Sequence, residues 1–239
     1  KPGIVDFVSS KKIIIIENSG QKSEYRLQKY QRSNQETCIN QRPIVWKGEK
    51  ILSGQIIADG TGINGGELSL GQNILVAYMP WQGYNFEDAI LINERLVYED
   101  VFTSIHIERY EVEILITNEG REQTTKNIPN LSPTEVLNLN DDGVIEIGTF
   151  VKPGDILVGK VTPKDDSEQL PEAKLLRAIF GAKAKGVRDS SFRMPSGEYG
   201  RVIRTIIFRR KSKLAYEFEK IQIFIAQVRK IQVGDKIAG

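Results

Sequence analysis

The residues best suited to chemistry lie between positions 79 and 88, where the sequence reads MPWQGYNFED. This segment follows an apolar run and combines three aromatic side chains with a glycine, an asparagine and two adjacent carboxylates, Glu87 and Asp88. In a turn, adjacent carboxylates can converge on a hydrated Mg²⁺, because this ion binds proteins through few carboxylates and several water molecules. By spacing alone, a solvated surface pair is the more common arrangement, and no third acid nearby completes a cage. The pair is therefore a candidate metal site with a structural alternative.

A second candidate is Lys236, which follows Gly234 and Asp235 in an expected tight turn. A rigid turn can aim an ammonium group at a phosphate, although the same pattern is typical of an ordinary surface lysine. Similar turns are expected at Gly54 and Gly154, each followed by a short buried strand. The sequence contains no glycine-rich phosphate loop and no dinucleotide-binding motif.

Charge is unevenly distributed along the chain, although the net charge is only +2. Residues 83–113 contain eight acidic and two basic side chains, whereas residues 183–213 contain ten basic and two acidic ones. So many bases in one stretch can bind the phosphates of a nucleic acid or an acidic partner protein. They can equally form the solvated tip of a hairpin, and the pattern alone leaves both interpretations open.

The composition excludes several classes of protein. The chain has 239 residues, of which 40% are hydrophobic and 27% charged, as in ordinary folded domains. Its single cysteine, Cys38, and single histidine, His106, cannot form a disulfide framework or a zinc site of three or four Cys/His ligands. His106 is expected to face solvent on a strand, which argues against histidine-based catalysis. The longest apolar runs, 13–16 and 74–80, are too short to cross a bilayer, so no membrane partner is expected.

Short strands are expected to position the candidate residues. Apolar or alternating runs bounded by Gly, Asn and Ser predict strands at residues 4–8, 13–17, 25–27, 51–58, 73–79, 89–93 and 104–116. Capping and periodicity predict helices only at residues 94–100, 132–135 and 171–180. The expected fold class is mainly β with a few short helices (α+β), built on a barrel-like or sandwich-like β core with a protruding β module.

Five motifs together point to a known family. They read RSNQETCINQ, GELSLGQN, MPWQGYNFED, KLLRAIFG and VGDK, at residues 32–41, 66–73, 79–88, 174–181 and 233–236. In this order, they closely resemble the β subunits of bacterial-type, multisubunit DNA-directed RNA polymerases, above all the plastid-encoded and cyanobacterial-type members. The chain begins without Met and ends within a turn pattern, so we expect an internal fragment of a longer subunit.

The resemblance implies roles for the candidate residues. Enzymes of this family join nucleotides on a DNA template by two-metal phosphoryl transfer, and the largest subunit holds the catalytic Mg²⁺. By resemblance, Glu87 and Asp88 lie near the second, nucleotide-borne Mg²⁺, with water between, and Lys236 faces the RNA end or the nucleotide phosphates. A second family lysine lies beyond Gly239. The fragment alone is expected to be inactive as a polymerase.

The resemblance also implies a division into domains. Residues 1–110 are expected to form an active-site-proximal portion of the hybrid-binding core, residues 111–230 the flap over the RNA exit path, and residues 231–239 a truncated return strand. Four basic residues of the flap are expected to contact the exiting RNA or the flap tip: Arg201, Arg204, Arg209 and Arg210.

The partners implied by the resemblance are the largest (β′-type) subunit, the α subunits, an omega-type subunit and a sigma factor at the flap. Template DNA, nascent RNA and nucleoside triphosphates complete the set. The expected location is the plastid (chloroplast), with the bacterial cytoplasm as the alternative. Two other classes stay open on the residues alone: a lipoyl- or biotinyl-type carrier module with Lys236 as the modified lysine, and a metal-dependent hydrolase built on Glu87 and Asp88.

Overall fold

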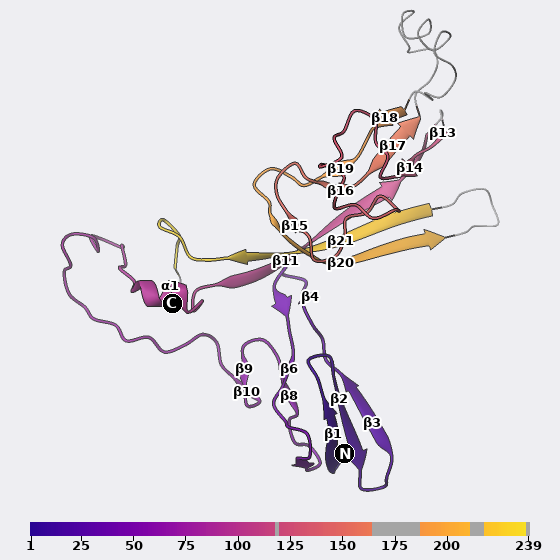
Figure 1. The fold of residues 1–239 in the computed structure, drawn as a ribbon. Helices are drawn as coiled ribbons and strands as arrows, with labels where there is room; N and C mark the ends of the chain where they lie inside the picture. Colours follow the sequence, from indigo (N-terminus) through magenta and orange to yellow (C-terminus); the bar gives the residue numbers. More distant parts are fainter. Residues whose placement is uncertain (118–119, 164–186, 211–217, 238–239) are drawn as a thin grey trace, which may run out of the picture. The chain divides into compact units, whose positions relative to one another are not determined.

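The computed structural model describes residues 1–117, 120–163, 187–210 and 218–237, and strands dominate this part of the chain (Figure 1). Its contacts divide the chain into two compact units. Unit 1 comprises Lys1–Ile107 and Val228–Gly239, and unit 2 comprises Glu108–Gln227. Helix α1 (Glu94–Tyr98) is the only helix among the described residues. The mainly β architecture confirms the predicted fold class, whereas the roles of the predicted domains stay predictions.

Unit 1 contains a four-stranded antiparallel sheet in the order β3-β2-β1-β7. Its strands are β1 (Gly3–Val8), β2 (Lys12–Glu17), β3 (Lys22–Arg26) and β7 (Lys50–Ile51). Because successive side chains on a strand point to opposite faces, β2 buries every second residue against its neighbours. This small core consists of Val5, Ile13, Ile15, Val45 and Ile51. The strands predicted at 4–8 and 13–17 are confirmed, and the third begins earlier than predicted.

Three short two-stranded ladders follow in unit 1. They pair β4 (Gln31–Arg32) with β5 (Cys38–Ile39), β6 (Arg42–Pro43) with β8 (Ala58–Asp59), and β9 (Ile63–Asn64) with β10 (Glu67–Leu68). The single strand predicted at 51–58 is wrong, because a turn with a left-handed glycine, Gly54 (φ 83°), separates β7 from β8.

Residues 69–92 join β10 to α1 without any strand. The strands predicted at 73–79 and 89–93 are therefore wrong. Both runs are apolar, but their large side chains are exposed except that of Ile92, which is half-buried, and those of Leu75 and Tyr78 are 101% and 100% exposed. A strand requires a neighbour to satisfy its backbone N–H and C=O groups, and no described segment pairs with this one.

Helix α1 forms where the sequence predicts a helix at 94–100, although it ends at Tyr98. Asn93 is its N-cap, and its side-chain oxygen accepts a hydrogen bond of 2.8 Å from the backbone N–H of Arg95. Leu96 is buried. A capping side chain that satisfies a free N–H group stabilises so short a helix.

Unit 2 is built on a four-stranded sheet in the order β11-β21-β20-β15. The strands are β11 (Ser104–Ile114), β21 (Phe218–Arg229), β20 (Gly200–Arg210) and β15 (Phe150–Val151). β20 and β21 form a long antiparallel pair (Figure 1). Alternate side chains of β21 are fully buried, namely Ile221, Ile223 and Ile225. The core of unit 2 therefore lies on one face of this sheet.

The long strand predicted at 104–116 is confirmed over β11. His106 lies on this strand, as predicted, but it is half-buried and its Nε2 atom is 2.9 Å from the Ser104 hydroxyl. The expectation that it faces solvent is therefore only partly correct, because a backbone bridge pairs it with Thr37.

The remaining strands of unit 2 form three small antiparallel sheets. These sheets are β14 (Gln123–Thr124), β17 (Lys160–Pro163) and β18 (Val187–Asp189); β16 (Ile156–Val158) and β19 (Phe192–Arg193); and β12 (Ile116–Thr117) and β13 (Gly120–Arg121). They add many of the side chains that complete the core of unit 2.

The helix predicted at 132–135 is wrong, because residues 133–138 form turns. The capping interaction itself is present, since the Glu135 carboxylate accepts hydrogen bonds from the Ser132 N–H group at 2.9 Å and from its hydroxyl at 2.8 Å. The chain then leaves the turns at Leu139, which is buried and bridges to Ile145. The helix predicted at 171–180 lies outside the described residues.

Candidate functional site

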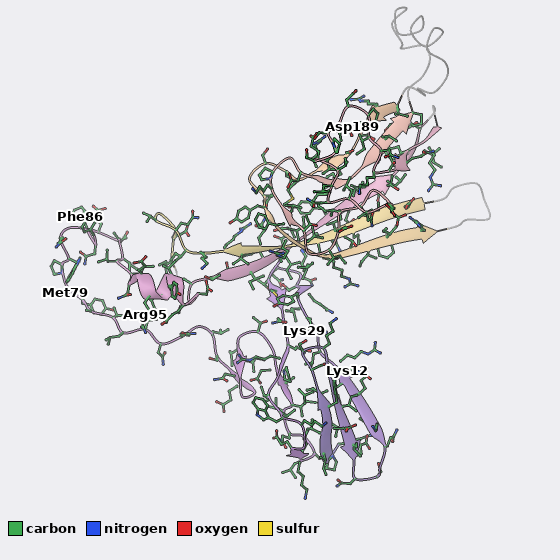
Figure 2. The ribbon with its side chains drawn as sticks, in the orientation of Figure 1. Lys12, Lys29, Met79, Phe86, Arg95 and Asp189 are labelled. Atoms are coloured by element: carbon green, nitrogen blue, oxygen red, sulfur yellow. The ribbon has the colours of Figure 1, made fainter. Side chains whose placement is uncertain are left out.

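The segment that carries the candidate carboxylates is folded into consecutive turns. The N–H of Tyr84 donates to the carbonyl of Trp81 at 2.9 Å, and the N–H of Phe86 donates to the carbonyl of Gly83 at 3.3 Å. A third turn closes from Ala89 N–H to the Phe86 carbonyl at 3.2 Å. Figure 2 shows Met79 and Phe86 on the bend of the segment between β10 and α1. The bend is thus a locally hydrogen-bonded structure.

The side chain of Asn85 joins the start of this bend to its end. Its Oδ1 atom accepts a hydrogen bond of 3.0 Å from the Trp81 N–H, and its Nδ2 group donates one of 2.7 Å to the Met79 carbonyl. Asparagine can do both because its amide carries a donor and an acceptor. The sequence pattern alone predicts no role for this asparagine.

Glu87 and Asp88 follow directly and are both exposed. Glu87 has a φ of 56°, a left-handed conformation that is uncommon for a residue with a Cβ atom. Within the described residues, neither carboxylate makes a hydrogen bond or ion pair, and no group of three His, Cys, Asp or Glu side chains is arranged to hold a metal ion. Two unpaired carboxylates fit contact with a hydrated Mg²⁺ through water, whereas they do not form a closed metal site.

Lys236 follows the turn that the sequence predicts. Gly234 has a φ of 96°, and the Asp235 N–H donates to the Gln232 carbonyl at 3.1 Å. The Asp235 carboxylate accepts a hydrogen bond of 2.9 Å from the Gln232 N–H, so it stabilises the turn. Lys236 is exposed, and its ammonium group makes no hydrogen bond or ion pair with any described residue. It is therefore available to an anion.

The same turn occurs elsewhere in the chain. At residues 46–49, 52–55 and 152–155 a left-handed glycine is again followed by a side-chain oxygen that accepts from the backbone N–H three residues earlier. All the glycine turns predicted from the sequence are confirmed. The buried strand expected after each turn follows directly only at Gly154, where it is β16. The repeated pattern of glycine followed by Asp, Glu or Gln is the signal that identifies the supporting residue Asp235.

A shallow depression of unit 1 lies beside Lys236. It is lined by Phe102, Ser104, Arg229, Lys230, Ile231, Asp235, Lys236 and Ile237. Of its three cations, Lys230 forms an ion pair of 2.9 Å with Asp100. A hydrogen bond from Lys230, together with one from Thr103, lowers the pKa of Asp100. Lys236 is thus the lining cation whose charge the described residues leave uncompensated, while Arg229 has an interaction partner of its own.

The candidate arginines of β20 differ in what they contact. Arg201 is exposed and donates to the Gly148 carbonyl at 2.7 Å, and Arg204 is exposed with its guanidinium 5.8 Å from the centre of the Phe224 ring. Arg209 instead forms ion pairs with Glu219 at 3.0 Å and with Asp142 at 3.3 Å. Hydrogen bonds to these two carboxylates raise the pKa of Arg209.

Arg210 is described only through its backbone, which pairs with Phe218. Glu87, Asp88 and Lys236 belong to unit 1, whereas all four arginines belong to unit 2. No contact between described residues joins the carboxylate pair to Lys236. The candidate residues therefore lie in separate groups, each of which is held by its own local contacts. No helix in the described part of the chain is long and apolar enough to span a membrane.

Comparison with known proteins identifies the class of protein that these parts belong to. The family model described as RNA polymerase Rpb2, domain 6, matches residues 1–239, and the chain belongs to this family. The expectation from the resemblance is therefore confirmed.

Particular relatives carry the name DNA-directed RNA polymerase subunit beta. The chain is 75% identical over 237 residues to the protein of Trieres chinensis, covering 99% of this chain and 17% of the relative. It is 57% identical over 240 residues to that of Thermosynechococcus vestitus, covering 99% of this chain and 22% of the relative. The chain thus spans about a fifth of the length of these relatives.

Proposed function

We propose that this chain is a segment of the β subunit of a DNA-directed RNA polymerase and acts in DNA-templated RNA synthesis. The observation that carries the proposal is the family match over the whole chain, together with 75% identity to a protein of that name. The family assignment replaces the carrier-module and hydrolase alternatives. The chain is more similar to the plastid-type subunit of Trieres chinensis than to the cyanobacterial subunit of Thermosynechococcus vestitus. This difference in identity supports a plastid location over a bacterial one.

In this proposal, Glu87 and Asp88 bind the nucleotide-borne Mg²⁺ through water. When bound, this ion neutralises the negative charge of the phosphates during phosphoryl transfer. The support is that both carboxylates are exposed, unpaired within the described residues and adjacent on a turn. The two carboxylates accept hydrogen bonds from the water molecules on the ion and so orient them. Their negative charge favours binding of the metal-loaded nucleotide.

Lys236 donates hydrogen bonds to a phosphate of the RNA end or of the incoming nucleotide. The support is the rigid turn at 232–235 and an ammonium group without a partner among the described residues. Charge-assisted hydrogen bonds to phosphate are about twice as strong as neutral ones. Since the main catalytic ion is held by the largest subunit in this family, the residues of this chain bind and orient the reactants.

Unit 2 acts as the flap in this proposal, with the α, omega-type and β′-type subunits and a sigma factor as partners of the intact protein. Arg201 and Arg204 are the arginines best placed to meet RNA phosphates, because both are exposed and neither is paired with a carboxylate in a described contact. Arg209 contributes less, because two carboxylates already bind its guanidinium.

The test uses polymerase assembled from the full-length β subunit and the other core subunits. Glu87→Ala combined with Asp88→Ala is expected to raise the KM for nucleoside triphosphates and the Mg²⁺ requirement. Lys236→Ala is expected to lower kcat/KM about 10- to 100-fold. Glu67→Ala and Lys47→Ala are the matched controls, because both side chains are exposed and make no described polar contact. Normal extension by assembled acid-pair and lysine variants would contradict the proposed site.

A further inference from the structure

Asn85 differs from every other residue in its part of the chain. From residue 63 to residue 91 all side chains are exposed except that of Asn85, which is half-buried. The whole stretch lacks a hydrophobic core to hold it. Its geometry therefore depends on polar contacts made within the segment itself.

Among those contacts, only the Asn85 side chain spans the bend. Both polar atoms of its amide are used, one on the Trp81 N–H and one on the Met79 carbonyl. The backbone between these points adopts left-handed conformations at Gln82 (φ 48°) and Gly83 (φ 78°). Such conformations persist only where surrounding contacts hold them, and here the amide supplies two of those contacts.

Asn85 is also close in sequence to the carboxylates. Glu87 is two residues later and is the second residue of the next turn, which runs from Phe86 to Ala89, and it adopts a left-handed conformation. The backbone that carries the Glu87 and Asp88 side chains therefore continues directly from the stretch that the Asn85 amide holds. A displacement of about 1 Å at a reacting group can cost a large factor in rate.

We propose that Asn85 is a positioning residue that holds Glu87 and Asp88 in the orientation needed to receive a metal-loaded nucleotide. The inference rests on the proposed function of the carboxylate pair. Asn85 itself does not touch the nucleotide or the ion. It acts by keeping the bend in one conformation before the nucleotide binds, which lowers the entropy lost on binding.

The first experiment measures kinetics in the assembled polymerase with the full-length β subunit. Asn85→Ala removes both hydrogen bonds, whereas Asn85→Asp keeps the acceptor for the Trp81 N–H but loses the donor to the Met79 carbonyl. Asn73→Ala is the matched control, because Asn73 lies on the same exposed segment and makes no described hydrogen bond. We expect Asn85→Ala to raise the KM for nucleotide about three- to tenfold with kcat at saturation nearly unchanged. Asn85→Asp should lie between the wild type and Asn85→Ala.

A second arm combines Asn85→Ala with Glu87→Ala and Asp88→Ala. If Asn85 acts through the carboxylates, the added substitution should not raise KM further, because the groups that it positions are already absent. A further rise in that background would show that Asn85 acts by another route and would overturn the proposal.

The third arm reads the conformation of the bend without measuring activity. Hydrogen exchange of residues 79–92 is followed in the assembled polymerase. The Trp81 amide, which donates to Asn85, should exchange about tenfold faster in Asn85→Ala and not in Asn73→Ala. Unchanged exchange in Asn85→Ala would show that the Asn85 hydrogen bonds do not hold the bend and would overturn the proposal.

The arms separate this inference from the proposed function. If the acid-pair variant is impaired but Asn85→Ala has a normal KM, the positioning role falls and the function of the pair stands. If the acid-pair variant has normal kinetics, both the proposed function of the carboxylates and the positioning role of Asn85 are overturned, even where exchange shows that Asn85 holds the bend. If Asn85→Ala does not assemble, the near-isosteric Asn85→Asp carries the same comparison of KM and exchange.

Discussion

Unit 2 and unit 1 hold their functional residues in place by different means. Within the described residues, sixteen buried hydrophobic side chains form one cluster in unit 2, whereas the main cluster of unit 1 contains five. In unit 1 the carboxylate pair lies on the segment of residues 69–92, whose large apolar side chains are exposed up to Leu91. The arginines of unit 2 stand on a strand with a packed face. Packing positions residues in unit 2, and single hydrogen-bonded turns position them in unit 1.

The two units should therefore differ in where they are sensitive to substitution. In unit 2, loss of a buried group should reduce the free energy of unfolding of the whole unit. In the 69–92 segment, loss of an exposed apolar side chain from the isolated chain should change the free energy of unfolding little, because that side chain buries little surface. The following tests measure the contrast.

The largest expected effect is that of Leu157→Ala in unit 2. Leu157 is 0% exposed, and removal of such a side chain costs about 2–5 kcal/mol of stability. Leu75→Ala is the matched substitution in the exposed segment and should cost less than about 0.5 kcal/mol. Hydrogen exchange of the 239-residue chain, read separately for each unit, measures both. Equal losses would contradict the contrast between the units.

The second effect concerns a buried ion pair in unit 2. The Glu122 carboxylate, with its side chain 7% exposed, accepts a hydrogen bond of 2.8 Å from the Lys160 ammonium. Glu122→Gln leaves this lysine without its counter-charge and should cost about 3 kcal/mol. Glu24→Gln, which breaks exposed ion pairs of unit 1, is the control and should change stability little.

The same pair makes unit 2 sensitive to acid. Burial tends to raise the pKa of Glu122, but hydrogen bonds from Lys160, the Leu115 N–H and Thr162 together keep this pKa below its ordinary value of 4.5. A carboxyl whose folded pKa is lowered stabilises the fold above its unfolded pKa, and this contribution is lost as pH falls through the folded pKa. The stability difference between wild type and Glu122→Gln should therefore shrink below about pH 4.5. A difference that is constant with pH would contradict this account.

A smaller effect is expected at the N-cap of α1. Asn93→Ala removes the hydrogen bond to the Arg95 N–H and should cost about 1 kcal/mol locally. Asn93→Ser keeps a capping oxygen and should restore most of it. Exchange of the amides at 94–98 measures the change, and exchange as slow in Asn93→Ala as in wild type would show that Leu96 packing alone holds the helix.

The smallest effect is expected for the exposed pair of Lys230 and Asp100. Lys230→Met should return the pKa of Asp100 upward toward its ordinary value, because the hydrogen bond from Lys230 is the main cause of its lowering. A titration followed by nuclear magnetic resonance measures this pKa. Little change in global stability is expected, since solvent and salt screen exposed pairs. A pKa of Asp100 that stays low in Lys230→Met would assign the shift to Thr103 instead.

Strand prediction succeeded where the predicted strand has a neighbouring strand to pair with and failed where it has none. The alternation of residues 104–116 predicts a strand with one buried face, and β11 confirms it. The run of four isoleucines at 13–16 also predicts a strand, and β2 confirms it, although only the structure shows that Ile13 and Ile15 are the buried ones. The apolar run 73–79 predicts a buried strand, but the segment has no pairing partner. An apolar run indicates that its side chains favour burial, but it does not specify which segment of the protein covers them.

The candidate site was predictable to a similar extent. The sequence identifies Glu87, Asp88 and Lys236 by residue type, motif and turn, and the turn before Lys236 is present. It treats Arg201 and Arg209 alike, whereas β-strand register pairs Arg209 with Glu219 across the ladder. Side-chain partners that are distant in sequence depend on that register, which no local pattern contains.

The sequence alone was enough to identify the family, the turns and the alternating strand at 104–116, because motifs, glycine at left-handed positions and period-two hydrophobicity act within short stretches of the chain. The fold was needed to show which apolar runs are buried, which arginines are paired and that Asn85 closes the bend before Glu87. These outcomes depend on contacts made in three dimensions. A hydrogen bond or a packed face requires both partners to be placed by the fold, and one stretch of sequence specifies only one of them.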